Sequence, residues 1–181
     1  MTLNFRLKAF ASPVLRLAAV VAIVGSVSAC GYALVGRGTA LPPGVASISI
    51  PTFQNKSGEP ELDIIVTSAV RDAFTLDGRL AVDDSGRADS TLTGVIESYS
   101  LQPVAFKPNG VASEYNVILV ISIIHKSTRP EKILIKQKVS VDWRYVAQGT
   151  IIASEGQRLL ATKEAAKKAA EAQISLVIEA F

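Results

Sequence analysis

Hydrophobic residues gather in five stretches that have the composition of β-strands. These stretches are residues 45–50, 80–82, 88–102, 114–126 and 132–145. Along 132–145 apolar and polar residues alternate, which predicts one buried and one exposed face. The run 114–126 is apolar almost throughout, which predicts burial on both faces. Residues 103–110 and 127–131 are the predicted turns, and Gly94 is a candidate bulge.

Two further segments have helical periodicity. From Leu62 to Phe74 apolar residues recur every three or four positions, and Asp77-Gly78 predicts the end of this helix. Residues 161–181 are rich in Ala, Lys and Glu, which favour helix. The order is strand, helix, short strand, three long strands, helix. It predicts an α+β fold, with both helices packed on one face of a mostly antiparallel sheet.

The first 29 residues have the three-part pattern of a secretory signal peptide. Arg6, Lys8 and Arg16 supply a positive start without acidic residues, and an apolar core follows at 17–27. Residues 27–29 (Val-Ser-Ala) place small side chains before a cleavage site. The apolar core is too short to span a bilayer, which needs about 20 residues.

Cys30 directly follows this cleavage site and is the only cysteine in the chain. An ordinary signal peptidase could cut the same bond, and the cysteine could be buried and inert. A lone thiol in an exported protein needs another explanation, however, because exported proteins meet oxidising conditions. Its position is similar to the bacterial lipobox, in which the cysteine becomes the lipid-bearing N-terminus. We therefore predict a lipoprotein signal peptide at 1–29, a lipidated linker at 30–44 and a single domain at 45–181.

The charge balance changes once the leader is set aside. The whole chain has 19 basic and 16 acidic residues. Since the leader contains three basic and no acidic residues, the remainder has equal numbers of each. The excess positive charge thus belongs to the leader, and it gives no reason to expect nucleic-acid binding.

Candidate catalytic groups are few. His125 is the only histidine, Asp83-Asp84 is a pair of carboxylates in a turn, and no P-loop, G-x-S-x-G or H-E-x-x-H motif occurs. We interpret His125 as a strand-end residue at the sheet rim, the aspartates as a solvated turn, and Trp143 as core. The sequence therefore predicts neither an enzyme nor a cofactor or metal site.

A row of basic residues accompanies the last two long strands. Its members are Lys126, Arg129, Lys132, Lys136 and Lys138. Even numbering predicts that Lys132, Lys136 and Lys138 share one face, with the last two about 7 Å apart. Such a row could bind phosphate groups on a lipid or sugar. The alternative, which the sequence alone favours, is an exposed strand whose lysines resist edge-to-edge aggregation.

Several short motifs in fixed order resemble a known family. They are Cys30-Gly31-Tyr32, Leu41-Pro42, Ile50-Pro51-x-Phe53-x-Asn55, Asp77-Gly78-Arg79-Leu80, Ala88-Asp89-Ser90-Thr91-Leu92-Thr93-Gly94 and Glu114-Tyr115. Together they resemble the LptE family of lipopolysaccharide-assembly lipoproteins, over essentially all of the chain after the leader. The resemblance implies a fold of two helices packed on a four-stranded sheet, in agreement with the α+β class.

The resemblance implies a non-enzymatic outer-membrane lipoprotein that sits as a plug inside an LptD-type β-barrel. The pair inserts lipopolysaccharide into the outer leaflet of the outer membrane. Gly31, where an aspartate would favour inner-membrane retention, agrees with this location. The family's link to lipopolysaccharide through basic residues does not map onto this chain by a motif. The five basic residues therefore remain candidates from strand geometry.

Two other hypotheses stay open on the sequence alone. One is a different envelope lipoprotein that faces the periplasm and acts as a protein-interaction module. The other is an enzyme acting on envelope glycans or lipids, for which His125, Asp83 and Asp84 are the best candidates.

Overall fold

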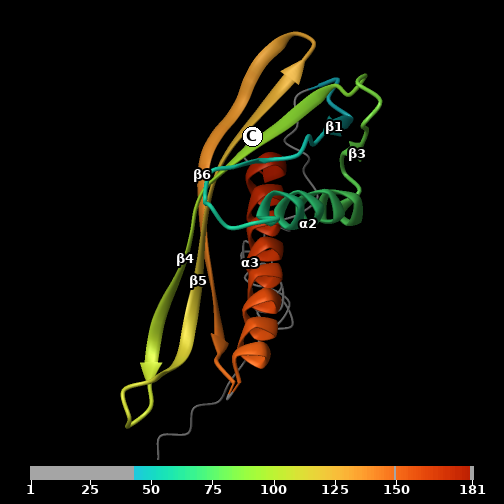
Figure 1. The fold of residues 1–181 in the computed structure, drawn as a ribbon. Coiled ribbons are helices and arrows are strands. Elements are labelled where there is room, and N and C mark those ends of the chain that lie inside the picture. The colour runs from blue at the N-terminus through green and yellow to red at the C-terminus, as the bar shows by residue number, and fades with distance from the viewer. Residues whose placement is uncertain (1–42, 149, 180–181) are drawn as a thin grey trace, which may run out of the picture. The chain divides into compact units, whose positions relative to one another are not determined.

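Three long antiparallel strands form most of the sheet in the computed structural model (Figure 1). They are β4 (Ser90–Phe106), β5 (Ala112–Thr128) and β6 (Glu131–Val146). The structure describes residues 43–148 and 150–179, which all belong to one unit. Cys30, the predicted signal peptide and nearly all of the predicted linker lie outside the described residues.

Three short strands complete the sheet on the far side of β4. They are β1 (Ser47–Ser49), β2 (Gln54–Asn55) and β3 (Ala81–Val82). The strand order is β3-β1-β4-β5-β6, with β2 also beside β4, and the pairings that involve β1 and β2 are parallel. The predicted α+β class and mostly antiparallel sheet are confirmed. The sheet has six strands rather than four, because very short segments add to it.

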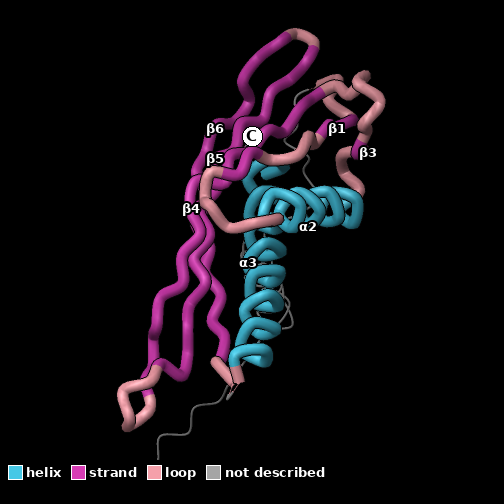
Figure 2. The backbone as a smooth tube through the Cα atoms, in the orientation of Figure 1, coloured by secondary structure: helices cyan, strands magenta, loops and turns pink. Residues whose placement is uncertain are grey.

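Both helices, α2 (Leu62–Asp77) and α3 (Ile151–Glu179), cover one face of the sheet, as Figures 1 and 2 show. Five of the alanines of α3 are buried, and their small side chains let the helix lie close to β5 and β6. The core also contains apolar side chains from α2 and from alternate positions of β5. These are Leu62, Val66, Val70, Phe74, Val117, Leu119, Ile121 and Ile123.

Glycines explain two local features. Gly78 ends α2 with φ 70°, and its N–H donates to the carbonyl of Phe74 at 3.1 Å, as the sequence predicts. Gly94 is not the bulge that we expected, because the register shifts between β4 and β5 lie further along, the first of them between Ile96 and Ser98. Instead, a Cβ at Gly94 would overlap the ring of Phe53, so the glycine lets that ring lie against β4.

Two element boundaries differ from the prediction. β4 continues through Pro103 to Phe106, where we expected a turn. Proline is tolerated there because β1 and β2 pair only with the beginning of β4, which leaves this part at the sheet edge. α3 begins at Ile151, ten residues before the predicted start, and its first part includes Gly156.

The prediction that β5 is buried on both faces is wrong. Its odd-numbered residues from Val117 to Ser127 are buried, whereas the even-numbered residues between them are only half-buried. The helices cover the first set, and no described element covers the second. None of the described helices is long and apolar enough to cross a bilayer.

Candidate functional site

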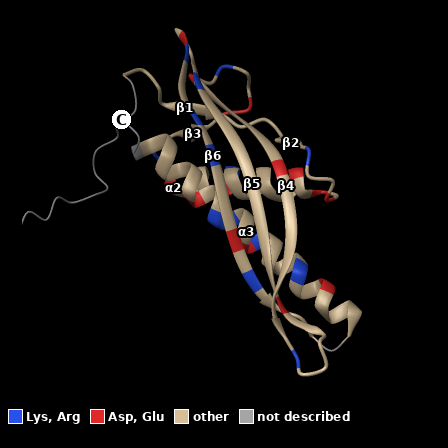
Figure 3. Cartoon of the chain, turned by 90° about the vertical axis from the view of Figure 1, so that its left-hand side faces the viewer, with Lys and Arg blue, Asp and Glu red and all other residues tan. Residues whose placement is uncertain are grey.

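The face of β4, β5 and β6 that points away from the helices, here called the outer face, carries the candidate site (Figure 3). Side chains that are directly opposite each other in an antiparallel pair point to the same side of the sheet. Lys136 is opposite Ile124, and Lys138 is opposite Ser122. Both partners are half-buried even-numbered residues of β5, so both lysines lie on the outer face.

The structure brings only three of the five basic candidates to this face. Lys126 joins Lys136 and Lys138 there. A register shift in β6 makes Ile133 the partner of Lys126 and Lys132 the partner of buried Ser127. Lys132 therefore lies on the opposite side of the sheet, and the prediction that it shares a face with Lys136 is wrong.

Arg129 lies in the turn between β5 and β6 rather than on the outer face. Its guanidinium donates to the carbonyl of Arg87 at 3.3 Å, which ties this turn to the residues just before β4. The side chain is exposed at the end of the sheet, where it is separate from the row of lysines.

Lys138 and Lys136 differ in their partners. The Nζ of Lys138 is 2.5 Å from Glu97 Oε2, and the hydroxyl of Ser122 donates to Glu97 Oε1, also at 2.5 Å. Hydrogen bonds from Lys138 and then Ser122 hold the pKa of the Glu97 carboxyl below its usual value. Lys136 has no ion-pair partner among the described residues, so its charge is available to a ligand.

A shallow pocket on the outer face lies beside these lysines. It combines two cationic side chains with hydroxyl groups and aliphatic side chains, and it is lined by Thr93, Val95, Ser122, Ile123, Ile124, Lys136, Gln137 and Lys138. The aliphatic character continues along β5 through half-buried Val120 and Ile118. Such a surface can hold an anionic group on its lysines and an apolar chain along β5.

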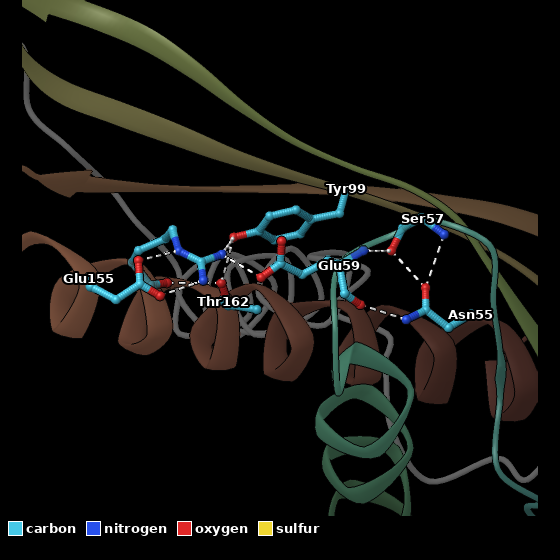
Figure 4. Close-up of polar contacts among 7 residues, drawn as sticks. Asn55, Ser57, Glu59, Tyr99, Glu155 and Thr162 are labelled. Carbon is cyan, nitrogen blue, oxygen red and sulfur yellow. Dashed lines mark hydrogen bonds and ion pairs between the residues drawn. The ribbon is translucent and has the colours of Figure 1, made fainter.

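A polar cluster around Arg158 was not predicted from the sequence (Figure 4). Its guanidinium makes ion pairs with Glu155 at 2.5 Å and with Glu59 at 2.6 Å, and it donates to Tyr99 Oη at 3.2 Å. The Tyr99 hydroxyl is 2.9 Å from that of Thr162. The cluster joins α3 to β4 and to the loop before α2. Because Glu59 and Tyr99 are far from Arg158 in the sequence, no local motif could reveal the cluster.

His125 lies near the end of β5, as we expected, but it is fully buried between the sheet and the helices rather than at the sheet rim. Neither ring nitrogen has a hydrogen-bond partner among the described residues. Burial lowers the pKa of His125 to about 4, because the charged imidazolium would be desolvated. With no exposed surface, this histidine cannot reach a substrate in the described structure.

The other singled-out residues have structural surroundings. Asp83 accepts the N–H of Ser85 at 2.7 Å, which fits the predicted turn. Hydrogen bonding by the Ser85 side chain, and then by its backbone, lowers the pKa of the Asp83 carboxyl. Asp84 lies 3.5 Å from Arg71. Trp143 is 39% exposed, so its predicted place in the core is wrong: β6 is the edge strand. In the described part of the chain, no His, Cys, Asp and Glu side chains group in a way that could hold a metal.

Comparison with known proteins identifies a family match. The model of the family described as "LptE: Lipopolysaccharide-assembly" matches residues 45–174, which include all described strands and most of α3. No curated protein matches the chain significantly.

Solved structures share the fold. A protein from Xanthomonas campestris is 14% identical, with a TM-score of 0.55 over 78% of this chain and 89% of that one. An uncharacterized lipoprotein B from Nitrosomonas europaea is 11% identical, with a TM-score of 0.52 over 78% and 90%. A hypothetical protein from Chlamydia trachomatis is 6% identical, with a TM-score of 0.53 over 73% and 97%. At these identities the likeness concerns the fold alone.

Proposed function

Because this chain belongs to the LptE family of lipopolysaccharide-assembly proteins, we propose that it is an outer-membrane lipoprotein that plugs an LptD-type β-barrel. In this role it assists the insertion of lipopolysaccharide into the outer leaflet without catalysing a reaction. The family match over residues 45–174 carries the proposal. The lone Cys30 behind a signal-peptide pattern supports attachment to the membrane through lipid.

The outer face supports direct contact with lipopolysaccharide. Lys126, Lys136 and Lys138 offer positive charge to phosphate groups, and Ile124 and Val120 offer an aliphatic surface to acyl chains. Since Lys138 already pairs with Glu97, Lys136 is the lysine that we expect to contribute most to anion binding. Arg129 and Lys132 are outside this proposed contact.

Co-purification tests the proposed partner. The lipidated full-length chain, expressed in its native envelope and purified in detergent, should retain a large outer-membrane β-barrel. Recovery of the chain without any barrel protein would contradict the plug role and favour a different protein-interaction module of the envelope.

A matched pair of lysine variants tests the proposed ligand contact. Lys136→Ala should weaken binding of purified lipopolysaccharide, whereas Lys132→Ala, which removes the same charge on the opposite side of the sheet, should leave binding almost unchanged. Equal losses in both variants would indicate a general effect of net charge. No loss in Lys136→Ala would remove the outer face as the contact, while leaving the plug role to the co-purification test.

A further inference from the structure

β6 has an open edge along its whole length. It is the last strand of the sheet, and no described strand pairs with its far side (Figure 2). The open edge is 16 residues long, from Glu131 to Val146. Edge strands of this length expose a row of backbone groups that can pair with another strand. α3 packs beneath β6 and supports it from the helix side.

We propose that this edge pairs with the β6 edge of a second copy of the chain, antiparallel and centred on Val139. In this arrangement each Lys136 is directly opposite Asp142 of the second copy, and each Lys138 is opposite Ser140. The two-fold symmetry produces both Lys136–Asp142 pairs at once. Opposite charges across an antiparallel pair are stabilising, and like charges are destabilising.

If the two-fold axis passed through a neighbouring residue of β6, side chains of the same face would still lie opposite each other. Each of these neighbouring registers is disfavoured, because it places like charges opposite each other. Centring on residue 137 places Lys136 opposite Lys138, and centring on 138 places Lys138 opposite itself. Centring on 140 places Lys136 opposite Arg144, and centring on 141 places Lys138 opposite Arg144. Only the register centred on Val139 avoids like-charge pairs among these five. The lysines therefore disfavour pairing of this edge in other registers and permit pairing in the register centred on Val139.

Apolar side chains on the helix side agree with this register. Ile135 would be opposite Trp143 of the second copy, and Val139 would be opposite itself. Trp143 lies at the open edge beside Leu160 of α3, and both line a pocket there. An aliphatic partner across the edge would cover the exposed indole, and aromatic–aliphatic pairs of this kind stabilise sheets.

One local contact must rearrange on pairing. Lys168 on α3 donates to the carbonyl of Asp142 at 3.0 Å, and its Nζ is 3.7 Å from the Asp142 carboxylate. Lys168 is half-exposed, so its side chain can move to solvent while Asp142 pairs with the second copy. The proposal concerns the chain by itself, and it does not depend on the proposed function.

Cysteine crosslinking tests the register. In Val139→Cys the two introduced cysteines would face each other across the two-fold axis, at a spacing that a disulfide can bridge. Val141→Cys is a matched control, because both valines are 6% exposed on the same side of β6. The Val141 positions would be about 14 Å apart, beyond disulfide reach. Oxidation of the full-length, lipidated chain should yield a covalent dimer only for Val139→Cys. Equal crosslinking of both variants, or of neither, would overturn the proposal.

A charge exchange tests the pairing itself. Asp142→Lys should raise the dimer dissociation constant at least about tenfold, because it places two lysines opposite each other twice. Adding Lys136→Asp to the same chain should restore the dimer, although it cannot restore the contact of residue 142 with Lys168. Sedimentation in detergent measures both. A wild-type chain that stays monomeric at every concentration, or an exchange that fails to restore the dimer, would contradict the proposal.

Discussion

His125 should make the stability of this protein depend on pH in a window where few other groups titrate. In the folded chain the imidazole is fully buried and has a pKa of about 4, whereas an unfolded chain has a histidine pKa of about 6.5. Above pH 6.5 the imidazole is neutral in both states, so it adds no pH dependence. As the pH falls from 6.5 towards 4, the unfolded chain gains a proton that the folded chain cannot accept, and the fold loses stability.

The size of this loss follows from the two pKa values. A pKa difference of about 2.5 units at about 1.4 kcal/mol per unit corresponds to roughly 3.5 kcal/mol at most, and most of this loss is reached by pH 4. That is a large share of the 5–15 kcal/mol that is typical of natural domains. Carboxylates with lowered pKa values, such as Glu97 and Asp77, begin to add their own losses below about pH 5, where the unfolded chain starts to protonate them.

His125→Leu isolates the contribution of the imidazole. Leucine has a similar volume and has no buried nitrogen that lacks a partner, so the variant should be at least as stable as wild type at pH 7.5. Urea unfolding at half-unit steps from pH 7.5 to 4.5 gives both stability curves. The wild-type curve should fall from about pH 6.5 towards the acid end, whereas the His125→Leu curve should stay nearly flat down to about pH 5, where the carboxylates begin to lower both curves. Parallel curves over this range would refute the buried, neutral histidine.

Three further substitutions test local contacts. Gly94→Ala should destabilise the fold by about 1–3 kcal/mol, because its Cβ would overlap the Phe53 ring. Denaturant unfolding at pH 7 measures this loss, and an unchanged midpoint would contradict the packing. Arg158→Ala should lower the free energy of unfolding by about 1–3 kcal/mol, since Glu59 loses its partner. It should also speed hydrogen exchange in the first turns of α3, and unchanged exchange there would count against the cluster. Thr67→Val hardly changes the shape of the side chain, but it removes the acceptor of the buried Phe53 N–H. It should lower the free energy of unfolding by about 1–3 kcal/mol, and equal stability would argue against that hydrogen bond.

The sequence was sufficient for the fold class because the main elements have strong local patterns. The stripe from Leu62 to Phe74 and the cap at Gly78 predict α2 with nearly its observed bounds. The short strands β2 and β3 have only two residues each. β3 lies within the strand predicted at 80–82, whereas β2 was not predicted, because it forms where β4 offers a pairing edge that no local pattern reveals.

The candidate site shows the limit of reasoning from alternation. One residue added in β6 exchanges the faces of Lys132 and Ile133, because the side-chain period of a strand is two. Alternation alone cannot reveal such a shift, since Leu134 is apolar and fits the pattern on either face. Trp143 was misplaced for a different reason. Its exposure depends on β6 being the edge strand, and strand order is a tertiary property.

The most direct test of the outer face as a lipopolysaccharide contact is photo-crosslinking in living cells. A photo-reactive residue at position 136 of the full-length chain should capture lipopolysaccharide. The same residue at position 132, on the opposite side of the sheet, should capture much less. Equal capture from both positions, or capture from position 132 alone, would contradict the assignment of the outer face.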